Sequence, residues 1–327
     1  MKKTIRGISL LLTASLFLAL PGQAQKAASE PTQPAGAGTA PLDPLKVALL
    51  KWYQANQTTS FSVGSQPYGI AFDGANVWVA NFGAGTVSKL RASDGALQGT
   101  FKVGNQPFGI AYDGANIWVS NSADGTVTKL RGSDGANLGT FTAAGVPGSG
   151  WIAFDGQNIW VPTSGGTVTK LRASDGKSLG TFTVGYGAIA AAFDGNNIWV
   201  TNYGAGTVTK LRASDGTVLG TFTVGSNPVG MAFDGTNMWV ANRGSTTVTK
   251  LRASDGSVLG NFTVPSGGYG AAFDGTNIWL SGDTIITELS TSGKVINYVS
   301  RFPTSGIAFD GANIWVSGTD FNLVYKF

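Results

Sequence analysis

The chain contains no cysteine and no histidine, and only 12% of its 327 residues are charged. The missing cysteine excludes disulfides, a lipid-modified cysteine, thiolate metal sites and a cysteine nucleophile. The missing histidine excludes a Ser-His-Asp triad and any histidine-ligated zinc or copper site. Only carboxylates are left to hold a metal, which leaves room for calcium or magnesium. We therefore predict no cofactor, with a divalent cation as the single open alternative.

Long apolar runs are also scarce, and the one that stands out lies near the start. Residues 1–24 hold three basic residues, an apolar run at 8–20 and a small-x-small pattern at 22–24. This pattern is typical of a secretory signal peptide rather than an uncleaved anchor, because the run is short and no stop-transfer pattern follows. We expect an exported protein, periplasmic or extracellular, without a membrane span in its mature form.

The charge balance changes once the predicted signal is removed. The formal charge of the whole chain is +4, but the remainder holds 19 basic and 18 acidic residues, a net charge of +1. Generic attraction to nucleic acid or to an anionic membrane needs a clustered basic surface, and the net charge gives no support for one. We therefore do not expect nucleic acid as a partner.

Glycine is abundant, with 48 residues, and a unit of about forty residues recurs seven times from residue 58 to the end. In the first unit we predict strands at 69–72, 77–80, 86–91 and 99–103, named A to D, with Asp-Gly hairpin turns between A and B and between C and D. A fixed period with four strands per unit predicts an all-β protein, a seven-bladed β-propeller with four-stranded blades. One tryptophan recurs on strand B, and we predict that it packs between blades. These tryptophans are Trp78, Trp118, Trp160, Trp199, Trp239, Trp279 and Trp315.

The two ends of the repeat array complement each other. The last unit stops at strand C, residues 323–327, whereas residues 60–64, ahead of the first unit, match strand D. We therefore predict that the N-terminal strand completes the last blade, a 3+1 closure that removes open sheet edges. The propeller then spans residues 58–327, preceded by a flexible linker at 25–42 and a short docking helix at 43–56. We expect a monomer.

The repeat pattern resembles the YVTN-type and NHL-type propellers of secreted bacterial proteins. Trp199-Val200-Thr201-Asn202 stands where that family has Tyr-Val-Thr-Asn, with Trp in place of Tyr. The resemblance covers residues 58–327 and implies the fold. It does not fix the function, because the class includes surface-layer proteins, a periplasmic DNA-associated propeller, lactonases and the streptogramin lyase. The lyase mechanism implied by the resemblance uses a histidine base with a metal, and this chain has no histidine.

Strand C carries a Lys-x-Arg pair in five units, beginning with Lys89 and Arg91. One interpretation is a ring of basic side chains that grips a polyanion. We favour the other, in which these side chains pair with the turn aspartates and keep solvated charged ends. The reason is that each pair lies just before an Asp-Gly turn and that the aspartates nearly match the basic residues in number.

Propeller geometry places the A–B and C–D turns on one face and the D–A and B–C loops on the other. The turns are nearly identical in every unit and the loops differ, so we predict that the loop face recognises a glycan, a peptide or a protein partner. Its aromatic rings, together with Arg243, the only Lys or Arg in any B–C loop, are the predicted ligand-binding residues. They are Tyr68, Phe82, Phe108, Trp151, Tyr186, Tyr203, Arg243, Tyr269 and Phe321. The alternative is that the rings only fill the central channel.

Three hypotheses for the function follow. The favoured one is an exported, non-catalytic binding propeller, because the chain lacks His, Cys and spare carboxylates. The second is a metal-dependent lyase-like or lactonase-like enzyme, with Asp283 and Asp320 from neighbouring units as weak metal ligands and Asp124 farther round the ring. The third is single-strand nucleic acid binding by stacking along a basic groove, which the near-neutral charge disfavours.

Overall fold

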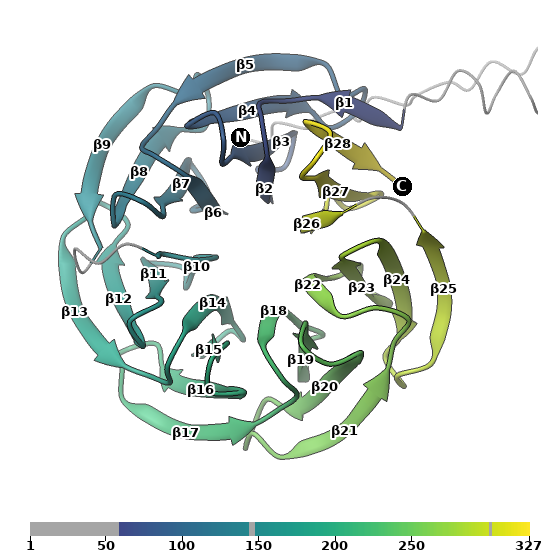
Figure 1. The fold of residues 1–327 in the computed structure, drawn as a ribbon. Helices are drawn as coiled ribbons and strands as arrows, with labels where there is room; N and C mark the ends of the chain where they lie inside the picture. The colour runs from purple at the N-terminus through teal and green to yellow at the C-terminus, as the bar shows by residue number, and fades with distance from the viewer. Residues whose placement is uncertain (1–58, 144–147, 301–302) are drawn as a thin grey trace, which may run out of the picture. The chain divides into compact units, whose positions relative to one another are not determined.

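The computed structural model describes residues 59–143, 148–300 and 303–327, which form seven four-stranded antiparallel sheets around a central axis (Figure 1). The prediction of an all-β, seven-bladed propeller with four-stranded blades is confirmed. The predicted signal peptide (1–24), linker (25–42) and docking helix (43–56) lie outside the described residues. Within the described ranges, no helix has the length and apolar character needed to cross a membrane.

Strands A to D of each blade run from the central channel to the rim (Figure 1). Blade 1 is β2 (Pro67–Phe72), β3 (Asn76–Asn81), β4 (Thr86–Arg91) and β5 (Leu97–Lys102); blade 2 is β6 (Pro107–Tyr112), β7 (Asn116–Asn121), β8 (Thr126–Arg131) and β9 (Asn137–Thr142). Blade 3 is β10 (Ala153–Phe154), β11 (Asn158–Thr163), β12 (Thr167–Arg172) and β13 (Ser178–Thr183); blade 4 is β14 (Ala188–Phe193), β15 (Asn197–Asn202), β16 (Thr207–Arg212) and β17 (Val218–Thr223). Blade 5 is β18 (Pro228–Phe233), β19 (Asn237–Asn242), β20 (Thr247–Arg252) and β21 (Val258–Thr263); blade 6 is β22 (Gly268–Phe273), β23 (Asn277–Gly282), β24 (Ile285–Ser290) and β25 (Val295–Ser300). Blade 7 is β26 (Thr304–Phe309), β27 (Ile314–Gly318), β28 (Leu323–Lys326) and β1 (Ser60–Ser62).

Blade 7 confirms the predicted closure, because its outermost strand is the N-terminal β1. Strand β1 pairs antiparallel with β28, with Phe61 opposite Val324. The Lys326 backbone amide donates to the Thr59 carbonyl at 2.8 Å. The Lys326 ammonium also donates to the carbonyl of Ala92 in blade 1 at 2.9 Å, so blade 7 is joined to blade 1 by side chain as well.

The recurrent tryptophan has a polar role that the repeat pattern does not reveal. In blade 1 the indole Nε1 of Trp78 donates to the Asp73 carboxylate at 2.7 Å, and the same carboxylate accepts from the Asn76 amide at 2.6 Å. The aspartate of the A–B turn thus closes the turn and satisfies a buried indole N–H. The other six blades repeat the indole bond at 2.7 Å.

The apolar part of the tryptophan packs between blades, as predicted. Trp78 is fully buried in a cluster with Ile110, Ile117 and Leu130 of blade 2. Trp315 of the last blade packs in the same way against Val77 and its neighbours in blade 1. The core is therefore a ring of interblade clusters rather than one central core, and each blade depends on its neighbour for burial.

In the Lys-x-Arg pairs, the arginine follows the prediction and the lysine does not. Arg91 forms the expected ion pair with Asp94 of its own C–D turn, at 2.8 Å. Lys89 does not keep a solvated charged end: it is 8% exposed and donates at 2.7 Å to the carbonyl of Gly132 in blade 2. The reason is register, since Lys89 lies opposite Trp78, with its ammonium 4.9 Å from the indole ring, and both side chains point toward the next blade.

The turn aspartates predict that stability falls in acid. Burial raises the pKa of Asp73, but the hydrogen bonds from Trp78, Ala75 and Asn76 outweigh it and leave the pKa below the usual 3.8. In the C–D turns, hydrogen bonds from the backbone and side chain of the second residue after the aspartate, with a smaller contribution from the turn arginine, lower the pKa of Asp215 and Asp255 to about 2. A pKa lowered by folding gives stability that is complete above 3.8 and is lost as the pH falls toward 2.

We therefore expect the melting temperature to be nearly constant between about pH 8 and 5 and to drop steeply between about pH 4 and 2. Thermal unfolding followed by circular dichroism at constant ionic strength measures this profile. Asp234→Asn should make the drop in acid shallower, because it removes one carboxylate whose pKa folding lowers. A profile that falls at neutral pH instead would contradict this assignment.

Candidate functional site

The loop face is built on a backbone that repeats from blade to blade. In blade 1 the Asn81 side chain ends strand B, accepts from the Gly64 amide at 3.1 Å and donates to the Thr86 hydroxyl at 3.0 Å. Asn121 and Asn202 make the same pair of bonds. The next residue along the chain then bonds back to the D–A loop, as the Phe82 amide does to the Gln66 carbonyl at 2.9 Å.

Two sets of positions vary on this repeated backbone. A loop position is the residue that directly follows the end of strand B. A channel position is the second residue of strand A; in blade 3, where strand β10 is short, it is the residue that matches this position by strand register. The loop positions, in blade order, are Phe82, Ser122, Ser164, Tyr203, Arg243, Asp283 and Thr319. The channel positions are Tyr68, Phe108, Gly150, Ile189, Val229, Tyr269 and Ser305. A fixed frame that carries a different side chain in each blade is what a recognition surface on a repeat protein requires.

Four of the predicted rings form a continuous cluster over blades 1 to 3. Tyr68 lies 5.1 Å from Phe82 and 4.9 Å from Phe108, measured between ring centroids. Phe108 meets Trp151 edge-on at 4.4 Å. Trp151 also lines a small cavity of about 130 Å³ among the innermost strands, so this ring partly fills the channel, as the alternative interpretation expects.

A second cluster lies over blades 4 to 6 and centres on Arg243. Its guanidinium carbon lies 4.2 Å from the Tyr269 ring centroid, and Nη1 donates to the Tyr203 hydroxyl at 3.4 Å. Nη2 is 4.0 Å from the Asp283 carboxylate, and among the described residues the buried Nε has no hydrogen-bond partner. Burial raises the pKa of Tyr269; Arg243 opposes this shift, and the Asp283 carboxylate, Tyr68 and Tyr203 add to it.

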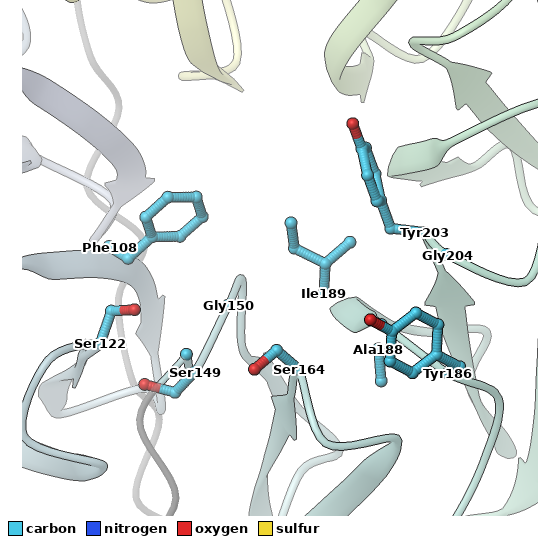
Figure 2. Close-up of a pocket in the computed structure, with 12 residues that line it drawn as sticks. Phe108, Ser122, Ser149, Gly150, Ser164, Tyr186, Ala188, Ile189, Tyr203 and Gly204 are labelled. Atoms are coloured by element: carbon cyan, nitrogen blue, oxygen red, sulfur yellow. The ribbon is translucent and has the colours of Figure 1, made fainter.

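Between the two clusters lies a pocket of about 420 Å³, and Figure 2 shows the residues that line it. It is lined by Phe108, Ser122, Gly148, Ser149, Gly150, Ser164, Tyr186, Gly187, Ala188, Ile189, Tyr203 and Gly204. We name it the blade 3 pocket, because the channel position of blade 3 is Gly150, where four other blades place a large side chain. The missing side chain leaves space between Phe108 and Ile189, the channel residues on either side.

Gly150 is needed for the close approach of two blades. A Cβ atom there would overlap the Ile189 carbonyl. The adjacent Trp151 amide donates to that same carbonyl at 2.9 Å, and the Ala191 amide donates to the Trp151 carbonyl at 2.9 Å. Blades 3 and 4 are therefore joined by a parallel bridge between their innermost strands, which holds the floor of the pocket in place.

The predicted site residues divide into groups in the structure. Tyr68, Phe82, Phe108 and Trp151 come together, as do Tyr203, Arg243 and Tyr269. Tyr186 joins Tyr203 and Phe108 at the blade 3 pocket, whereas Phe321, 53% exposed in blade 7, is not among its lining residues. The binding role of all nine remains a prediction.

The carboxylates considered for a metal have the following places. Asp283 faces Arg243, and Asp124 accepts from the Asn105 amide at 2.7 Å, which gives it a role in shaping its own loop. Asp320 lies in the loop between β27 and β28. In the part of the chain that the structure describes, no three His, Cys, Asp or Glu side chains come close enough together to hold a metal ion.

The residues that a search for aromatic and charged side chains misses are the small ones at the pocket. Ser122, Ser149 and Ser164 line the pocket, and Gly150 contributes space. One signal was available, because 42 residues separate Trp118 from Trp160, whereas 40 separate Trp78 from Trp118. The longer unit marks the blade whose inner strand departs from the repeat.

Comparisons with known proteins place the fold. A model of the PQQ-type repeat family described as outer membrane protein assembly factor BamB matches residues 123–276, less than half of the chain. Hydrazine synthase from Kuenenia stuttgartiensis superposes with a TM-score of 0.70 at 16% identity, over 80% of this chain and 95% of that one. A streptogramin B lyase superposes with a TM-score of 0.68 at 20% identity, over 82% and 95%. None of the curated proteins compared with the sequence matches it.

The chain is thus a seven-bladed β-propeller structurally similar to streptogramin B lyase, a YVTN/NHL-type propeller, and to PQQ-type repeats. The predicted resemblance is confirmed at the level of the fold. At sequence identities of 16% and 20%, the similarity shows the fold and not the function, because the propeller fold hosts many unrelated functions.

Proposed function

We propose that this chain is an exported binding propeller without catalytic activity of its own, and that it recognises its ligand on the D–A/B–C loop face. One observation carries the proposal: on a repeated backbone, the variable positions of this face gather aromatic rings in two clusters, one of them around Arg243, on either side of a pocket. Aromatic rings offer contact area at low conformational cost, and a partly buried arginine offers directed hydrogen bonds. The opposite face repeats the Asp-Gly turn between strands A and B in all seven blades.

Binding is favoured over the enzymatic alternative by the chemistry of the chain. The lyase mechanism implied by the family resemblance needs a histidine, and the sequence has none. Asp283, one of the carboxylates considered for a metal, already faces Arg243. Export is supported by the signal-like pattern of residues 1–24.

Phe108→Ala should abolish or strongly weaken ligand binding, because Phe108 belongs to the aromatic cluster and also lines the pocket. The measurement is a thermal-shift screen of residues 25–327 with neutral oligosaccharides, acidic oligosaccharides and short peptides. A ligand at a hundred times its Kd adds about 2.7 kcal/mol, or roughly 5–10 °C for a protein of this size.

The matched control is Tyr298→Ala, which removes an exposed ring from outer strand β25, away from the loop face. It should bind as the unaltered chain does. A screen in which no class of probe shifts the melting temperature, or a shift that survives Phe108→Ala, would contradict the proposal.

A further inference from the structure

We propose that the blade 3 pocket binds one neutral sugar residue of a glycan, with the sugar face on its tyrosine rings and the sugar hydroxyls toward its serines. This inference rests on the proposed function and names the ligand class. The first observation is the chemistry of the lining, which contains aromatic rings, aliphatic groups, three serines and backbone, and no charged side chain. The volume of about 420 Å³ lies within the range of small-molecule sites, roughly 300–1,000 Å³.

The rings and the hydroxyls occupy different sides of the pocket. Figure 2 shows Phe108 across from Tyr186 and Tyr203, with the three serines along a third side. Tyr186 is 75% exposed, an unusual amount for a ring, so the free protein keeps this apolar surface in water. A sugar ring presents C–H groups on its faces and hydroxyls around its edge, which matches this division.

Ser149 adds a second, independent observation. The residue is 1% exposed, and among the described residues its hydroxyl has no hydrogen-bond partner. A buried hydroxyl without a partner is unfavourable, and native structures rarely keep one without a reason. Ser149 lines the pocket, so rotation of its side chain toward the pocket would let a ligand hydroxyl pair with it and remove this cost.

Other ligand classes fit less well. A fully apolar ligand would leave the buried Ser149 hydroxyl without a partner. An anionic ligand would find no cation in the lining, since Arg243 stacks on Tyr269 and faces Asp283 instead. A neutral ligand with many hydroxyls suits the rings and can also give the Ser149 hydroxyl a partner.

The test is titration calorimetry of residues 25–327 with maltotriose, cellotriose and N,N′,N″-triacetylchitotriose, and with trigalacturonate as the acidic match. At least one neutral trisaccharide should bind, and trigalacturonate should bind at least about tenfold more weakly. The apolar probe 1-naphthol should not compete. Equal or tighter binding of trigalacturonate, or competition by naphthol, would overturn the ligand class.

Three variants locate the site. Tyr186→Ala should weaken binding about tenfold or more, whereas Tyr186→Phe keeps the ring and should cost about threefold or less. Ser149→Ala should weaken binding yet leave the melting temperature of the free protein equal or higher, because its hydroxyl lacks a partner there. A purely structural Ser149 would give the opposite pair of results, and Tyr298→Ala should change nothing.

The outcomes separate this inference from the proposed function. Suppose that a peptide or an acidic oligosaccharide binds, that Phe108→Ala abolishes this binding, and that no neutral trisaccharide binds. The proposed binding on the loop face would then stand, and the proposal of a neutral sugar ligand would be wrong. Binding of a neutral trisaccharide that is unaffected by Tyr186→Ala and Ser149→Ala would overturn the pocket. If no probe of any class binds, both proposals fall.

Discussion

A chain that begins at residue 65 should lose at least about 10 °C of melting temperature relative to one that begins at residue 57. Removing β1 leaves β28 without its outer neighbour and takes away Phe61, whose ring centroid lies 5.5 Å from that of Trp315. Loss of a fully buried large aromatic typically costs about 3–5 kcal/mol, and for the partly buried Phe61 we take the lower value, about 3 kcal/mol. In a protein of this size that corresponds to roughly 6–12 °C, and the lost strand pairing adds to it.

The shortened chain should also associate, because an open sheet edge pairs with other chains. Size-exclusion chromatography over a range of concentrations measures this, alongside thermal unfolding. The chain from residue 57 is the matched control, since it keeps β1 and lacks the same upstream region. Melting temperatures within about 2 °C of each other, with both chains monomeric, would show that the ring does not depend on the closing strand.

The fold could be predicted from the sequence because the residues that determine it recur in every unit. Each blade repeats a tryptophan on strand B and an Asp-Gly turn before it, and these are the groups joined by the indole hydrogen bond. The contacts that one blade makes with the next could not be predicted. The burial of Lys89 depends on the C–D turn of blade 2 lying over it, a contact that no pattern within one unit records.

The site was predictable in part, for a related reason. Rings and an arginine in variable loops are visible in a sequence, so Phe108, Tyr203 and Arg243 could be chosen by their chemistry. The blade 3 pocket depends on a side chain that is missing at Gly150, and an absent group gives no chemical signal. Gly150 is found to occupy the position of Tyr68 only when the units are aligned with each other, by their shared Ile-Ala-Phe-Asp-Gly run or by strand register.

Gly150→Ala should be the most damaging single methyl addition on the loop face. The new Cβ would overlap the Ile189 carbonyl, which is backbone and already accepts the Trp151 amide. The Gly150 carbonyl is itself held by the Ser120 hydroxyl at 2.8 Å, so neither side has room to move. We expect a loss of about 3 kcal/mol, the upper part of the usual range for overpacking, or roughly 6–12 °C, measured by thermal unfolding.

Gly204→Ala is the matched control, because it adds the same methyl group to the same pocket. Its Cβ would meet the Tyr186 ring, an exposed side chain that can swing away, so stability should stay within about 0.5 kcal/mol. Since that movement takes the ring from its place at the pocket, ligand binding should weaken although the fold does not. Equal stability of the two variants would mean that blades 3 and 4 can move apart at Gly150. The inference that the bridge between them holds the pocket floor rigid would then be wrong.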